Sequence, residues 1–290
     1  VRVEVDATAT SPFDNVFWKR SFGSGHAKLT NRADWQSHLA QAVTDLGLLG
    51  VRYHGLFDDD MGVVQAHRTY NWTKADAAWD YQVKQGVTPI VELSFMPAVL
   101  ANCTWVPPSG GAAVNPGHDA CRHTTMKYRG IIQAPAVWDD WRHLVGALAS
   151  HLVERYTLAA VRTWRFEVWN ELWGMPFPSD YMQLFRASSA ALKAVDPGLR
   201  VGGPATAQLQ DAAAFVTACE TASPPIPYDF VSTHMYPTDP QCPRGEQWGP
   251  DCLPAKVKAL RATIDAKIPL LLTEYNVGCC LGYAQHDTSA

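Results

Sequence analysis

Hydrophobic positions recur along the chain with two periods, one typical of strands and one typical of helices. Apolar or alternating runs predict strands at residues 1–5, 22–26, 51–55, 88–93, 161–169, 199–203, 228–233 and 269–273. Apolar stripes with a period near 3.6 predict helices at residues 31–47, 73–85, 138–152, 181–192, 211–220 and 256–266. Asn31 is the expected N-cap of the first helix, and Gly47 its expected stop.

Strands and helices therefore alternate, as in a parallel sheet flanked by helices. Counting from Phe22, seven strand–helix starts have spacings that suit a (β/α)8 TIM barrel of the α/β class. No Gly-rich phosphate-binding motif follows any strand, which argues against the usual nucleotide-binding folds. We interpret residues 1–290 as one barrel domain, with no second domain visible.

Composition and charge exclude several classes of protein. The 290 residues include 24 Lys and Arg against 28 Asp and Glu. The resulting net charge of −4 argues against a nucleic-acid partner. No apolar run approaches the roughly 20 residues that a membrane helix needs. The 11 tryptophans suit either a packed core or stacking against sugar rings.

The cysteines and two glycosylation sequons indicate a secreted or lumenal protein. Cys103 and Cys121 bracket one Pro/Gly-rich stretch and Cys242 and Cys252 another, which predicts two disulfide-stapled loops, with buried free thiols as the alternative. The pairing of the other cysteines, Cys219, Cys279 and Cys280, stays open. Asn71 and Asn102 each begin an Asn-x-Thr sequon, so we expect a secreted glycoprotein.

Polar residues gather at the carboxyl ends of the predicted strands, the edge at which a barrel carries its active site. They are His26, Arg52, His54, Glu92, Asn170, Glu171, His234, Tyr236 and Glu274. Glu171 and Glu274 each follow buried strand residues, where a carboxylate is costly unless something uses or pairs it. Glycoside cleavage needs two carboxyl groups, one to protonate the leaving oxygen and one to attack or to activate water. A salt bridge is the alternative for either glutamate taken alone.

The sequence resembles glycoside hydrolase family 39 of clan A, the family of β-xylosidases and α-L-iduronidases. Trp169-Asn170-Glu171, at the end of the matching segment Phe166-Glu167-Val168-Trp169-Asn170-Glu171, is similar to the Asn-Glu acid/base motif of the clan. The other matching segments, in family order, are Phe22-Gly23-Ser24-Gly25-His26, Arg52-Tyr53-His54-Gly55, His234-Met235-Tyr236 and Thr273-Glu274-Tyr275-Asn276. The resemblance covers nearly the whole chain.

This resemblance implies a retaining hydrolase, with Glu171 as general acid/base and Glu274 as nucleophile. It implies that Asn170 bonds the 2-hydroxyl of the sugar and that Tyr236 donates to Glu274. The residues implied to surround the −1 sugar are His26, His54 and His234. Arg52 is expected to lower the pKa of the nucleophile, and Glu92 to be an ion-pair partner within the barrel. No cofactor and no metal are expected; a carbohydrate is the expected partner.

Two departures from the family keep an alternative open. Leu172 stands where family members commonly have proline. The chain ends before an eighth strand, so the barrel looks truncated after the seventh, and a missing C-terminal segment or a second chain is expected to complete it. The alternative function is a non-catalytic, hydrolase-like structural or carbohydrate-binding glycoprotein. Another clan A activity would keep the mechanism and change the substrate.

Two further motifs receive plainer interpretations. Asp58-Asp59-Asp60 lacks the spaced ligands of a calcium loop, and a solvated loop is expected there. The serines lack the nucleophile-elbow motif, so a serine hydrolase is not expected.

Overall fold

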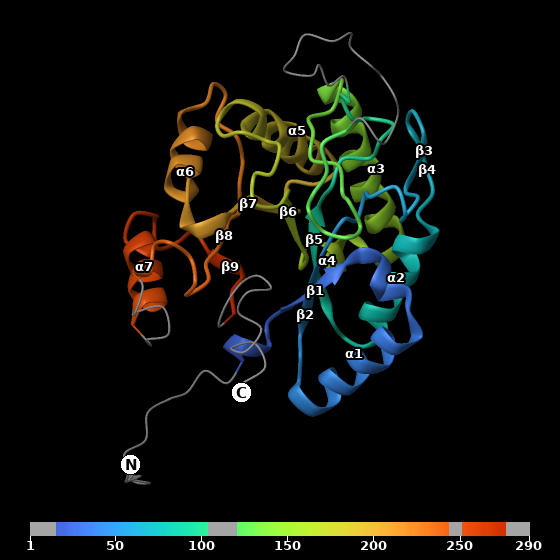
Figure 1. Ribbon diagram of the computed structural model, residues 1–290. Coiled ribbons are helices and arrows are strands. Elements are labelled where there is room, and N and C mark those ends of the chain that lie inside the picture. The colour runs from blue at the N-terminus through green and yellow to red at the C-terminus, as the bar shows by residue number, and fades with distance from the viewer. Residues whose placement is uncertain (1–15, 104–120, 244–250, 277–290) are drawn as a thin grey trace.

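Seven parallel strands form one curved sheet in the order β1-β2-β5-β6-β7-β8-β9 (Figure 1). The computed structural model describes residues 16–103, 121–243 and 251–276. The strands are β1 (Phe22–His26), β2 (Gly50–His54), β5 (Thr88–Leu93), β6 (Arg165–Val168), β7 (Arg200–Thr206), β8 (Phe230–His234) and β9 (Leu270–Glu274). The predicted α/β fold is confirmed: within these residues the sheet is an incomplete (β/α) barrel whose edges are β1 and β9.

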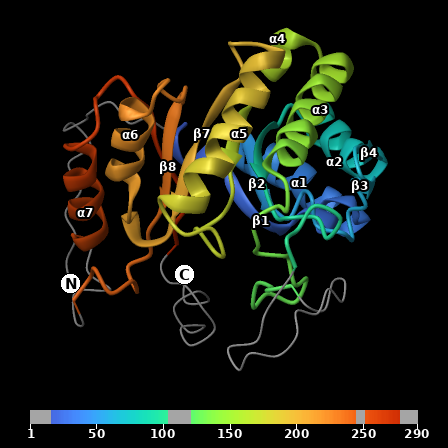
Figure 2. The same cartoon turned by 90° about the horizontal axis from the view of Figure 1, so that it is seen from above.

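Helices lie along the outer face of the curved sheet (Figure 2). They are α1 (Ala33–Leu46), α2 (Thr73–Lys84), α3 (Trp138–Tyr156), α4 (Leu158–Val161), α5 (Ser179–Val195), α6 (Ala212–Thr221) and α7 (Cys252–Arg261). The 3-10 turns are η1 (Phe17–Lys19), η2 (Ala27–Asn31) and η4 (Ala207–Leu209). The longest helices, α3 and α5, are joined inside the core, where the Trp141 indole donates to Ser188 Oγ at 2.8 Å.

The strand register determines which side chains meet at the carboxyl edge. Residues of β5 and β8 are almost continuously buried, as expected for strands covered on both faces. In the β5–β6 pair Glu92 lies opposite Glu167, and in the β8–β9 pair His234 lies opposite Glu274. Polar residues that are far apart in sequence are therefore aligned by backbone pairing alone.

Several predicted element boundaries need correction. The first helix is capped by Arg32 and not by Asn31, which ends η2, whereas the predicted stop at Gly47 is confirmed by its left-handed φ of 66°. The strand predicted at 161–169 begins only at Arg165, because the preceding residues form α4 and a turn. The last helix, α7, begins at Cys252 and not at residue 256. Its proline, Pro254, lies in the first turn, where the helix needs no backbone N–H donor.

Two further outcomes concern a small hairpin and the first predicted strand. A small hairpin of β3 (Val64–Ala66) and β4 (Thr69–Tyr70) was not predicted from the sequence. The strand predicted at 1–5 lies outside the described residues.

Both predicted disulfides are present, Cys103–Cys121 and Cys242–Cys252. Cys219 is a buried free thiol, while Cys279 and Cys280 lie outside the described residues. The sequon residues Asn71 and Asn102 are exposed. Within the described ranges, no helix has both the length and the apolar character that crossing a membrane requires.

Candidate active site

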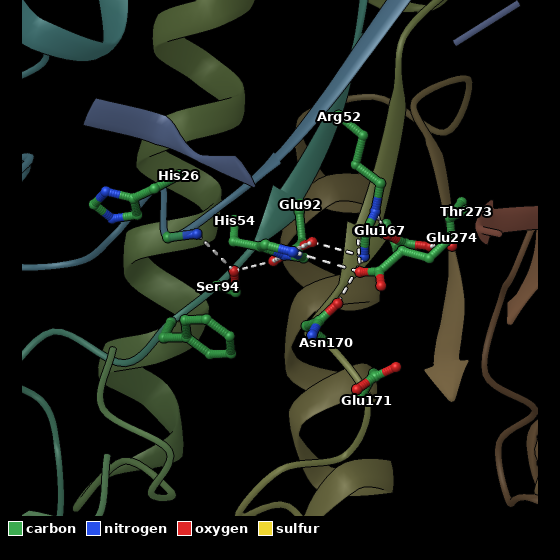
Figure 3. Close-up of polar contacts among 12 residues, drawn as sticks. His26, Arg52, His54, Glu92, Ser94, Glu167, Asn170, Glu171, Thr273 and Glu274 are labelled. Carbon is green, nitrogen blue, oxygen red and sulfur yellow. Dashed lines mark hydrogen bonds and ion pairs between the residues drawn. The ribbon is translucent and has the colours of Figure 1, made fainter. Parts of the chain in front are cut away.

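The carboxyl ends of five strands bring most of the predicted polar residues together, and Figure 3 shows those from β2, β5, β6 and β9. Strand β2 carries Arg52 and His54, and β5 carries Glu92. Asn170 and Glu171 lie just beyond β6, and His234 and Glu274 are the last residues of β8 and β9. The edge predicted for the chemistry is therefore where these side chains lie.

Arg52 is the buried centre of the site. Its Nε donates to Glu167 Oε2 at 2.5 Å, its Nη1 to Glu274 Oε1 at 2.8 Å, and its Nη2 to Asn170 Oδ1 at 2.9 Å. Nη2 also lies 2.6 Å from Glu92 Oε2, as the predicted ion pair of Glu92 requires. Burial opposes the charge of Arg52, but the three carboxylates outweigh it and raise its pKa, so the guanidinium stays ionised.

Glu274 is held as an ionised carboxylate. Its Oε1 accepts from Arg52 and lies 3.4 Å from His54 Nε2, and its Oε2 accepts from the Tyr236 hydroxyl at 2.8 Å. Burial raises the pKa of this carboxyl group, but His234, Arg52, His54 and the Tyr236 bond together lower it to about 2. An ionised carboxylate at neutral pH is what a nucleophile needs.

Glu171 faces Glu274 across a short gap. Its Oε1 lies 2.9 Å from His234 Nδ1, which is also 3.7 Å from Glu274 Oε2. One oxygen from each glutamate and one His234 ring nitrogen all lie within 4.8 Å of one another. The two glutamates are therefore close to each other at the carboxyl edge of the sheet, with one nitrogen of His234 near both.

The same three atoms are the set that could surround a cation among the described side chains. Both oxygens of Glu274 already accept hydrogen bonds, from Arg52 and from Tyr236. The expectation of no metal stays a prediction.

The loop after β6 explains why proline is absent after Glu171. Glu171 and Leu172 both have left-handed backbone conformations, with φ of 53° and 54°. Proline is restricted to φ near −65°, so it cannot adopt the conformation of Leu172. The Glu171 amide donates to Ala205 O at 2.8 Å, which ties this loop to β7.

His26 lies beside the central cluster rather than in it. Its Nε2 is 3.0 Å from Asp58 Oδ2, and its ring stacks on Tyr128 with centroids 4.1 Å apart. Within the described ranges, it contacts neither Glu171 nor Glu274. Its predicted place beside the sugar stays a prediction.

The expectation of a solvated loop at residues 58–60 is wrong for Asp58. Only 4% of Asp58 is exposed, because it packs under His26 and accepts from the Phe95 amide at 3.3 Å. Burial raises its pKa, against the effect of His26. Gly55, with φ of 73°, makes room for this contact, since a Cβ there would lie 2.3 Å from Asp58 Oδ2.

Sequence reasoning also missed Glu167 and Thr273. Glu167 is fully buried, binds Arg52, and accepts from the Thr273 hydroxyl at 2.7 Å. A glutamate in the middle of an apolar strand was the available signal, because such a residue requires a buried partner.

Comparisons with known proteins identify the family of the chain. The sequence profile described as Glycosyl hydrolases family 39 matches residues 1–289. A β-xylosidase of Caldicellulosiruptor saccharolyticus is 35% identical over 241 residues, which cover 78% of this chain and 44% of the relative. Human α-L-iduronidase is 38% identical over 71 residues, 22% of this chain and 11% of that protein.

A solved structure shows the same fold. The crystal structure of a monomeric β-xylosidase from Caulobacter crescentus CB15 matches with a TM-score of 0.78 and 30% identity, over 94% of this chain and 55% of that one. The chain thus spans about half the length of the β-xylosidases it matches. The profile match over almost every residue, together with these relatives, shows that the chain belongs to glycosyl hydrolases family 39.

Proposed function

We propose that this chain is the catalytic barrel of a retaining glycoside hydrolase, with Glu171 as acid/base and Glu274 as nucleophile. The observation that carries the proposal is the pair itself: one oxygen of Glu171 and one of Glu274 lie within 4.8 Å of each other at the carboxyl edge of one sheet. This short distance supports a retaining enzyme, whose carboxyl groups are about 5–5.5 Å apart, over an inverting one, in which they are about 6.5–9.5 Å apart. The two carboxylates have different surroundings, since Glu274 accepts from Arg52 and Tyr236 whereas Glu171 contacts His234. Different surroundings are what separate an acid from a nucleophile.

The reaction then has two displacements. In the first, Glu274 attacks the anomeric carbon while Glu171 gives its proton to the leaving oxygen, so the glycosidic bond breaks and a glycosyl ester forms. In the second, Glu171 takes a proton from water, and the water oxygen displaces Glu274 from the same carbon. Two inversions restore the original configuration.

Asn170 is suited to hold the sugar during both steps. Its Oδ1 accepts from Arg52 at 2.9 Å, which fixes the orientation of the amide. The NH2 group then remains as the donor toward a sugar hydroxyl, as the family resemblance implies for the 2-hydroxyl.

The charges of the site favour a neutral sugar, a β-xyloside, over an iduronide. Arg52 and His54 are already engaged by carboxylates, and three carboxylates surround the one guanidinium. The carboxylate of a uronate would add a negative charge to this set. Among the described residues of the cluster, no cation is left to pair with it. Alternatives from the same clan differ in substrate and not in mechanism.

The test is the configuration of the first product. Hydrolysis of an aryl β-xyloside, followed by proton NMR before mutarotation, should show the β-sugar first. E274Q should lower kcat by about 1,000-fold or more, while E154Q, at an exposed position of α3, should leave it unchanged. An α-sugar formed first would contradict the proposal, and so would undiminished turnover by E274Q. No hydrolysis across a panel of glycosides would favour the alternative, a non-catalytic carbohydrate-binding glycoprotein.

We further propose that the protein is secreted and glycosylated. Two disulfides and the exposed asparagines of both sequons support this. Mass spectrometry of the natural protein should find glycans at Asn71 and Asn102, and unmodified peptides at both positions would contradict glycosylation.

A further inference from the structure

A buried carboxylate lies behind the proposed catalytic pair. Glu92 is 1% exposed, and its Oε2 lies 2.6 Å from Arg52 Nη2 and 2.9 Å from His54 Nδ1. Its Oε1 accepts from the Ser94 hydroxyl. Arg52 and His54 both continue to the same oxygen of Glu274, at 2.8 and 3.4 Å (Figure 3). Glu92 is therefore joined to the nucleophile through two bridges and does not touch it.

The His54 bridge works only in one protonation state. Nδ1 faces Glu92, and Nε2 faces Glu274. A neutral imidazole carries one N–H, so whichever nitrogen holds it, the lone pair of the other points at a carboxylate. Only the imidazolium donates to both carboxylates at once.

We propose that Glu92 is a positioning residue that keeps His54 as an imidazolium, so that Nε2–H is aimed at Glu274 Oε1. The inference rests on the proposed function for its effect on catalysis, but not for the state of His54.

Charged groups on three strands face His54. Glu92 on β5 and Glu274 on β9 favour the cation, whereas Arg52 on β2 opposes it. The ring also faces Phe95, with centroids 6.4 Å apart, which carries no charge. Burial lowers the pKa of His54, but Glu92, by its charge and its hydrogen bond, and Glu274 outweigh burial and raise it.

The consequence for catalysis has a defined direction. Below the raised pKa of His54 the imidazolium supports the ionised nucleophile. As the pH rises through that pKa, His54 keeps the proton on Nδ1 beside Glu92 and loses the one on Nε2. A lone pair then faces Glu274 Oε1, so attack should slow at alkaline pH.

The experiment follows the ring nitrogens of His54 by NMR in the intact chain labelled with 15N-histidine, without substrate. The His54 signals are identified by their loss in H54Q. In the wild type the imidazolium, with both nitrogens protonated, should persist to higher pH than in free histidine. In E92Q the midpoint of the His54 titration should fall by about 1 pH unit or more, because one opposite charge at hydrogen-bond distance is gone.

Glu167 provides the matched control. It is as buried as Glu92 and binds the same guanidinium, through Nε, but its partners are Arg52 and Thr273 and not His54. E167Q removes the same charge from the Arg52 cluster, so it should move the His54 titration by less than half as much. E92D, which keeps the charge, should restore part of the shift.

The outcomes separate this inference from the proposed function. A wild-type His54 that loses its second proton at or below the pH at which free histidine does would overturn it even if E92Q did not fold, and so would equal shifts in E92Q and E167Q. If hydrolysis is measurable, a suitable substrate is 2,4-dinitrophenyl β-xyloside, whose leaving group needs no proton from Glu171. With it, the alkaline limb of the kcat/KM profile should shift to lower pH in E92Q. An unmoved limb would overturn the catalytic role of Glu92. Absence of hydrolysis would contradict only the proposed function, because the NMR titration needs no turnover.

Discussion

At the scale of single residues, the site is built around one buried arginine. Arg52 donates to Glu167, Glu274 and Asn170 and pairs with Glu92, so each nitrogen of the guanidinium has a partner. A lysine would supply a point charge but not the planar fork that reaches these acceptors together. The guanidinium thus has both a structural and an electrostatic part in the site.

Removing that charge should destabilise the fold. R52M leaves Glu92 and Glu167 buried without their guanidinium, and we expect the free energy of unfolding to fall by about 3–5 kcal/mol. Urea denaturation followed by circular dichroism measures the loss. R32M, which breaks the exposed pair of Arg32 with Asp34, is the control and should change stability little. Equal stability of R52M and wild type would contradict the central place of Arg52.

The hydroxyl of Tyr236 should set part of the acid limit of activity. It donates to Glu274 Oε2, and this bond helps to hold the pKa of Glu274 at about 2, below its ordinary value of 4.5. A depressed carboxyl pKa means that the ionised form is lost as the pH falls through it. Y236F should therefore raise the pKa and move the acid limb of kcat/KM to higher pH. An acid limb at the same pH in both proteins would show that the bond does not tune Glu274.

At the scale of elements, strand register and one loop place the carboxylates. The β8–β9 register sets His234 opposite Glu274, and the loop after β6 turns Glu171 toward them through left-handed residues. Gly174 closes that loop, with φ of 68°, against Ile132: a Cβ there would lie 1.6 Å from the Ile132 carbonyl oxygen. The position of Glu171 therefore depends on a close backbone approach.

G174A should cost both stability and activity. Gly86 is the matched control, because its φ of 74° is equally left-handed but a Cβ there would meet nothing within 4 Å. We expect G86A to lower the free energy of unfolding by about 1–2 kcal/mol, the cost of a left-handed non-glycine residue, and to keep the activity. G174A should lose more stability and also kcat. Equal losses in thermal denaturation and unchanged kcat would contradict this account of the loop.

The sequence was most informative where an apolar run ends in a polar residue. That pattern located Glu171, Glu274 and His234, because strand ends in a barrel share one edge. It failed for Glu167, whose partner Arg52 is 115 positions away and is brought near only by strand order. It failed for Asp58 as well, since an acidic run gives no sign that one member is buried under His26.

At the scale of the whole molecule, the described part of the barrel assembles both carboxylates. Five of the seven strands of the large sheet contribute to the cluster, from β2 to β9, and the sheet order brings them to one edge. Alternation of strands and helices was enough to predict this architecture. The loop carrying Tyr128 lay beyond prediction, because its place against His26 depends on long-range packing and not on a local period.

The central claim is that Glu274 forms a covalent bond to the sugar, and trapping that bond is the most direct test. A 2-deoxy-2-fluoro-β-xyloside with a good leaving group should form the glycosyl ester and hydrolyse slowly, because fluorine destabilises the positively charged transition states of both steps. Peptide mass spectrometry should then find the added sugar on Glu274 and none on Glu171. A label on another residue, or turnover of xylosides with inversion and no label, would contradict the account.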